Sequence, residues 1–136
     1  MTSGLDAAMA RVGDRWTLLV VEALLDGPRR FSDLEEAIPG IAPNVLSARL
    51  RRLERDGLVV AEPYSQRPPR LEYRITDTGR ELAGALALLA RWGAGGGAED
   101  DIGPHHRSCG TPLEARWYCP TCDVVTEHTD DEGHWL

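Results

Sequence analysis

Three helical segments followed by a β-hairpin, all within the first 75 residues, predict a winged helix-turn-helix domain, a mainly α-helical fold with a small β wing. A glycine-rich and acidic stretch after residue 93 is typical of a linker. All three cysteines fall in the last 28 residues, which predicts a small separate unit. We therefore expect a DNA-binding and dimerisation domain over residues 1–93, a linker over 94–103 and a zinc-ribbon-like tail over 104–136.

The first two helices are bounded by capping and breaking residues. Asp14 suits the N-terminal cap of a helix whose apolar side chains recur at helical spacing until Gly27-Pro28 ends it. In the next segment Ser32 and Glu35 have the spacing of a capping box, and this short helix ends before Pro39-Gly40.

The third helix is expected from Pro43, which suits a first helical position, to the turn at Gly57. Leu46, Leu50 and Leu53 mark its buried face. A step of 100° per residue places polar and small residues on the opposite face. Those residues are Asn44, Ala48, Arg51 and Arg55, with Ser47 and Arg52 on the flanks. Arg49 is expected nearer the core edge, where its side chain reaches either a phosphate or an acidic neighbour.

That outer face suits entry into the major groove of DNA, where Arg bonds two acceptors on guanine and Asn bonds two groups on adenine. The alternative is an ordinary solvated helix, since Arg is also a strong helix former. The hairpin favours the first interpretation. Its tip presents Gln66, Arg67 and Arg70 around the stiff Pro68-Pro69 pair, and basic groups on a rigid projection suit a minor groove or backbone phosphates.

The formal net charge of −7 does not exclude such a partner. Residues 1–93 carry 13 Arg and 13 acidic residues, so the whole excess of negative charge belongs to residues 94–136. Within Pro43–Arg55, four Arg and one Glu give a local charge of +3. The basic patch is local, and the acidity belongs to the tail.

The segment over roughly residues 8–93 resembles the HxlR-type transcriptional regulators, which are bacterial winged-helix proteins. The motifs that carry the resemblance are Gly13-Asp14-Arg15-Trp16, Arg30-Phe31-Ser32-Asp33-Leu34, Leu46-Ser47-x-Arg49-Leu50 and Pro68-Pro69-Arg70-x-Glu72-Tyr73. The resemblance implies a homodimer on double-stranded operator DNA. It also implies that Asn44, Ser47, Ala48 and Arg51 face bases, while Arg52, Arg67 and Arg70 hold the backbone or minor groove.

The last helix of the domain also predicts a homodimer. It is expected over Gly79–Trp92, capped by Thr76 or Thr78, and its apolar residues do not keep to one face. A helix that is apolar nearly all round must be covered on more than one side, and a partner chain is the economical cover. The short apolar helix over Leu5–Val12 is expected to join this interface. Packing against the chain's own tail is the alternative.

The tail contains His106-x-x-Cys109 and Cys119-x-x-Cys122, with nine residues between the pairs. Three Cys and one His form a common tetrahedral, structural Zn²⁺ set. His105 is an alternative fourth ligand, and His128 and His134 are weaker candidates. A redox dithiol or unligated thiols are the other interpretations. Some HxlR-type proteins sense oxidants through a cysteine near the N-terminal helix, but this chain has none before Cys109.

The sequence therefore predicts a dimeric, sequence-specific DNA-binding regulator, more often a repressor by analogy of fold. A protein-interaction module that docks onto transcription machinery through the acidic tail is the second hypothesis. An enzyme is not expected, because the sequence has no open zinc motif, no nucleophile paired with His and no phosphate-binding glycine loop. The absence of a long apolar run and of a signal sequence predicts a cytoplasmic protein without membrane contact.

Overall fold

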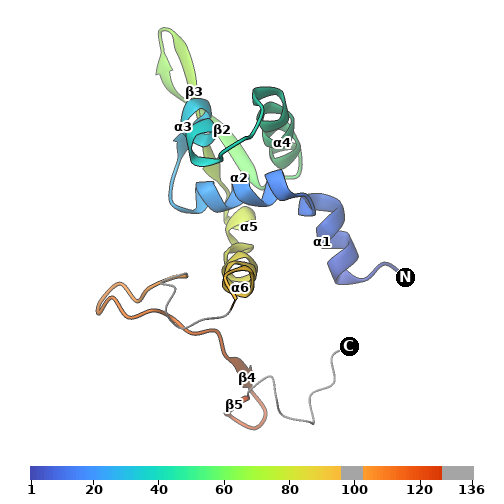
Figure 1. Cartoon of the computed structure of the whole chain (residues 1–136). Helices are drawn as coiled ribbons and strands as arrows, with labels where there is room; N and C mark the ends of the chain where they lie inside the picture. The colour runs from blue at the N-terminus through green and yellow to red at the C-terminus, as the bar shows by residue number, and fades with distance from the viewer. Residues whose placement is uncertain (96–102, 127–136) are drawn as a thin grey trace. The chain divides into compact units, whose positions relative to one another are not determined.

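The computed structural model describes residues 1–95 and 103–126. Two compact units divide between Leu86 and Ala87. The first contains α1 (Gly4–Val12), α2 (Arg15–Leu25), β1 (Arg29–Arg30), α3 (Phe31–Ala37), α4 (Pro43–Arg55), β2 (Val59–Gln66), β3 (Pro69–Ile75) and α5 (Asp77–Arg80) (Figure 1). Helix α6 (Ala83–Gly93) crosses the division, and the second unit contains β4 (Trp117–Cys119) and β5 (Val124–Thr126).

The first unit has one apolar core, to which α2, α3, α4, β2 and β3 all contribute. The leucines of α4 lie at its centre, because Leu46, Leu50 and Leu53 are each no more than 1% exposed. This confirms the inner face predicted for the helix. The other core residues are Val12, Val20, Val21, Leu24, Leu34, Ile38, Ile41, Leu58, Val59 and Ile75.

The start of α2 agrees with the prediction, and the start of α3 does not. Oδ1 of Asp14 accepts a hydrogen bond from the backbone N–H of Thr17 at 3.0 Å, so Asp14 caps α2. The predicted capping box of Ser32 with Glu35 was wrong. Because β1 keeps the chain extended through Arg30, α3 begins one residue before Ser32, and the carboxylate of Asp33 accepts the Arg30 N–H at 2.9 Å.

The turn between α3 and α4 is fixed by apolar anchors. Ile38 and Ile41 are 2% and 8% exposed, so both ends of the turn are buried in the core. Gly40 between them has a φ of +83°, a left-handed conformation that glycine adopts without strain. These contacts set the angle between the two helices of the helix-turn-helix motif.

The wing is an antiparallel hairpin in a three-stranded sheet of order β1-β3-β2. Val59 pairs with Ile75 at its base and Gln66 with Pro69 at its tip, so Arg67 and Pro68 form the turn. Figure 1 shows the hairpin projecting beyond the helices. Strand β1, only two residues long, was not expected from the sequence, because so short a run carries no alternation of apolar and polar residues.

The single helix predicted over Gly79–Trp92 was wrong in its extent. Thr76 is the cap, because its hydroxyl accepts the Gly79 N–H at 3.1 Å, but α5 ends at Arg80 and α6 begins at Ala83. The N–H of Leu82 donates to the carbonyl of Gly79 at 3.1 Å, the tight bond of a 3₁₀ turn. None of the helices in the described ranges has the length and apolar content needed to cross a bilayer.

Candidate nucleic-acid interface

Helix α4 divides into a buried side and an exposed side, as its sequence predicts. The exposed residues are Asn44, Ala48, Arg51 and Arg55, and the half-buried flanks are Ser47 and Arg52. The outer face therefore presents two guanidinium groups, an amide and two small side chains to solvent. Its small residues leave room for close approach of another surface, which suits the floor of a major groove.

Arg49 has a structural partner. Its Nε lies 2.9 Å from Oδ1 of Asp14, so one carboxylate both caps α2 and holds α4 against it. Burial tends to raise the pKa of Asp14, but hydrogen bonds from Thr17 and then from Arg49 outweigh it and hold the pKa below its usual value. Asp14 is therefore charged at neutral pH, and this pair fixes the orientation of α4.

Arg52 also bonds to the protein's own backbone. Its guanidinium donates to the carbonyl of Ala10 in α1. In return Arg11 of α1 donates to the carbonyl of Asp56, just after α4, at 3.2 Å. These two bonds attach α1 to the C-terminal end of α4. The structure thus gives Arg52 a partner other than the DNA backbone that the resemblance implied for it.

The wing carries paired charges along its length and exposed basic groups at its tip. Arg74 lies 3.3 Å from Glu62 and 3.8 Å from Glu72, so its charge is balanced within the sheet. At the tip Gln66, Arg67 and Arg70 are all exposed. Positive charge that is not balanced by a neighbour is therefore concentrated at the end of the projection.

The arginines of the two candidate surfaces share one property. Among the residues described by the structure, no hydrogen bond or ion pair engages the side chains of Arg51, Arg55, Arg67 or Arg70. We call the outer face of α4 and the wing tip together the basic surface: Asn44, Ser47, Ala48, Arg51, Arg55, Gln66, Arg67 and Arg70.

Sequence reasoning missed an interaction of Arg30, at the start of α3, with the wing. Arg30 donates to Asp33 at 2.8 Å, and the interactions with Asp33 and then with Tyr64 of β2 raise the pKa of the guanidinium. The second interaction joins the start of α3 to the wing. The Arg30–Asp33 pair could have been predicted from the sequence, because the two residues are three positions apart at the start of a helix. The interaction with Tyr64 depends on the fold, so no sequence pattern indicated it.

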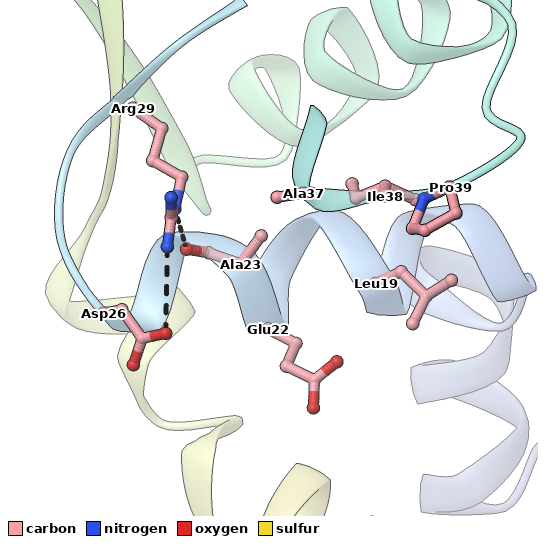
Figure 2. Close-up of a pocket in the computed structure, with 8 residues that line it drawn as sticks. All are labelled: Leu19, Glu22, Ala23, Asp26, Arg29, Ala37, Ile38 and Pro39. Carbon is pink, nitrogen blue, oxygen red and sulfur yellow. Dashed lines mark hydrogen bonds and ion pairs between the residues drawn. The ribbon is translucent and has the colours of Figure 1, made fainter. Parts of the chain in front are cut away.

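A pocket of about 310 Å³ lies between α2 and the end of α3, away from the basic surface (Figure 2). Leu19, Ala37, Ile38 and Pro39 form its apolar part, with Glu22 beside them. At one end Arg29 donates from Nε to the carbonyl of Ala23 at 2.8 Å and lies 3.8 Å from Asp26. No residue of the basic surface lines this pocket.

The sequence-predicted metal ligands lie in two turns of the second unit. Nδ1 of His106 is 3.2 Å from Sγ of Cys109 in the first turn, and Cys119 and Cys122 lie in the second. Hydrogen bonds from Thr111 lower the pKa of Cys109 to about 7, and backbone N–H groups of Cys122 and then Thr121 lower the pKa of Cys119. Within residues 1–95 and 103–126 no three His, Cys, Asp or Glu side chains share one cluster. His128 and His134 lie outside the described residues.

A family model described as HxlR-like helix-turn-helix matches residues 11–100. The chain belongs to this family. The matched region spans α2 through α6, so it includes the helix-turn-helix motif and the wing. The resemblance expected from the sequence motifs is confirmed.

Two relatives show how far the similarity reaches. The HTH-type transcriptional regulator Rv3095 of Mycobacterium tuberculosis is 39% identical over 124 residues, which cover 85% of this chain and 74% of the relative. That share is too large to be confined to the winged domain. YvaP of Bacillus subtilis is 39% identical over 87 residues, covering 64% of this chain and 81% of the relative.

Two solved structures of transcriptional regulators are similar to this chain in both fold and sequence. The HTH-type transcriptional regulator ytcD matches with a TM-score of 0.65 and 35% identity over 69% of this chain and 96% of its own. The redox regulator HypR in its reduced form matches with a TM-score of 0.65 and 32% identity, covering 68% of this chain and 92% of the HypR chain. The fold is therefore a winged helix-turn-helix. By family the chain is a helix-turn-helix transcriptional regulator, in a class that is not enzymatic.

Proposed function

We propose that this HxlR-like protein is a dimeric, sequence-specific DNA-binding regulator. The single observation that carries the proposal is the division of α4. Its leucine side is sealed in the core, and its opposite side exposes Asn44, Arg51 and Arg55 beside a basic wing tip. A recognition helix needs this combination of a rigid inner face and a polar outer face.

In the proposed complex the outer face of α4 enters the major groove. Arg51 is placed to bond the two acceptor atoms of a guanine, and Asn44 the paired groups of an adenine. Ser47 and Ala48 keep the helix close to the base edges because their side chains are short. Arg55, one turn further along the helix, suits a phosphate at the edge of the groove.

The wing supplies the second contact. Arg67 and Arg70 at its tip are exposed, and nothing else in the described chain neutralises them. Such groups bind phosphates or a narrow minor groove with little dependence on sequence. The two surfaces therefore have separate roles, base preference from α4 and general affinity from the wing.

Exposed apolar side chains support the proposed homodimer. None of the residues of α6 is buried, and Leu89 and Trp92 are 50% and 82% exposed. In α1, Leu5 and Met9 are 69% and 43% exposed. Large apolar groups in two such helices favour coverage by a second copy of the chain. A dimer that covers an operator blocks access to a promoter, so repression is the proposed direction of control.

Selection of bound oligonucleotides from a random pool tests this proposal. We expect enrichment of an inverted repeat whose half-sites lie about 34 Å apart or a multiple of that, because two recognition helices are related by a twofold axis. Binding should weaken steeply with salt, since phosphate contacts release counterions. Retention of no DNA even at low salt would contradict the proposal and favour a protein partner for the domain.

A further inference from the structure

The tail contains the same backbone turn twice. In the first copy the N–H of Gly110 donates to the carbonyl of His106 at 2.7 Å, and Gly110 has a φ of +71°. In the second the N–H of Asp123 donates to the carbonyl of Cys119 at 2.9 Å, and Asp123 has a φ of +57°. Each turn is thus closed by a bond from its fifth residue to its first, and the fifth residue is left-handed.

The chain on either side of each turn is also paired in the same way. The N–H of His106 donates to the carbonyl of Thr111 at 2.8 Å, and Cys119 pairs with Val124 where β4 meets β5. In both copies the first residue of the turn is therefore aligned with the residue five positions later. The two loops therefore share their closure, their left-handed fifth residue and their flanking pairs.

The two turns also share the kind of side chain at their first and fourth positions. These side chains are His106 and Cys109 in one turn and Cys119 and Cys122 in the other. In the first pair Nδ1 of His106 lies 3.2 Å from Sγ of Cys109. In the second pair the two thiols occupy the same two positions of the same kind of turn. Each turn therefore aims two potential metal ligands at one point, and all three cysteines are free thiols.

The segment needs an additional source of stability, because it has no core of its own. None of residues 103–126 is buried, and Trp117, Tyr118 and Val125 are more than half exposed. Binding of a structural metal can supply the folding free energy that such a short segment lacks.

We propose that these two turns are the halves of one structural zinc site, in which His106, Cys109, Cys119 and Cys122 coordinate a single ion. Three thiolates and one imidazole complete a tetrahedral set and leave no open position, so the site is structural and not catalytic. Each half-site is formed in the structure, but no three of these side chains share a cluster there. The ion must therefore draw the two turns together. His106 is the fourth ligand in preference to His105, because it occupies the first position of a turn, as Cys119 does.

The test uses the full chain, reduced and loaded with zinc, then dialysed against a weak chelator. We expect about one zinc ion per chain, and replacement by Co²⁺ should give thiolate charge-transfer bands together with the intense visible bands of tetrahedral cobalt. Cys109→Ser, Cys119→Ser and His106→Gln should each lose stoichiometric zinc. His105→Gln is the matched control and should retain it.

A second readout does not depend on metal analysis. Arg107 lies within the first turn and Arg116 lies between the two turns, and both are trypsin sites. Zinc should slow cleavage at these two positions at least tenfold by ordering the backbone, while a strong chelator should restore fast cleavage. Cleavage after Arg80, in the other unit, should not respond to zinc.

Three results would overturn the proposal. They are a reduced chain that binds no zinc, zinc that survives Cys119→Ser, and isolation of a Cys119–Cys122 disulfide in a chain that takes up no metal after reduction. Loss of zinc by His105→Gln and not by His106→Gln would overturn the assignment of the fourth ligand. None of these results bears on DNA binding by the winged domain, which the oligonucleotide selection tests separately.

Discussion

The double variant Arg51→Glu with Arg55→Glu is expected to lose specific DNA binding, with an affinity for the selected operator at least ~100-fold lower than that of the wild type. A bidentate contact from Arg to guanine contributes about 1–3 kcal/mol, and every 1.4 kcal/mol is about tenfold in affinity. The variant removes such a contact and a phosphate contact, and it places two carboxylates in a groove lined by phosphates.

Both side chains are exposed and bond to no other residue in the described parts of the chain, so the fold should not change. Fluorescence anisotropy with a labelled operator measures the affinity, and thermal unfolding checks the fold. The control is Arg80→Glu, an exposed arginine of α5, which lies across α2 from α4 (Figure 1). A double variant that binds as well as this control would contradict the assignment of α4 as the recognition helix.

Leu50→Ala is expected to destabilise the winged domain by about 2–5 kcal/mol, because it removes a buried leucine from the middle of α4 and leaves a cavity. Leu50 is 1% exposed and lies in the core with Leu46 and Leu53. Domains of this size have a free energy of unfolding of about 5–15 kcal/mol, so the loss is a large part of the total.

Urea denaturation followed by circular dichroism measures this change. The matched control is Leu71→Ala in the wing, where the side chain is 48% exposed and the cost should stay within about 0.5 kcal/mol. Equal destabilisation by the two substitutions would mean that α4 is not anchored by its leucine face.

The sequence predicted those parts of the fold that depend on local periodicity. Leu46, Leu50 and Leu53 recur at helical spacing, so the inner and outer faces of α4 followed directly, and the family motifs were confirmed by the HxlR-like match. Arg49 at the core edge was open to two interpretations, a phosphate or an acidic neighbour, and the structure shows the neighbour to be Asp14.

Features that depend on contacts between distant segments were not predictable. The bond from Arg52 to the carbonyl of Ala10 joins residues 42 positions apart, and no pattern within α4 distinguishes Arg52 from Arg51 or Arg55 in this respect. Gly79 of α5 makes another contact of this kind. Gly79 packs so closely that an added Cβ would lie 2.3 Å from the carbonyl oxygen of Leu58, a contact between segments far apart in the sequence.

The central claim is that α4 reads bases while the wing holds the backbone, and the most direct test is the base preference of two alanine variants. Affinities are measured for the selected operator and for every single-base change in one half-site, with the wild type, Arg51→Ala and Arg67→Ala. Arg51→Ala should abolish the preference for the correct base at one position, a difference of about 1–3 kcal/mol in binding free energy, and leave the preferences at the other positions unchanged. Arg67→Ala should weaken binding to all sequences alike. If Arg51→Ala leaves every base preference intact, or Arg67→Ala changes the preference at one position, the proposed division of roles is contradicted.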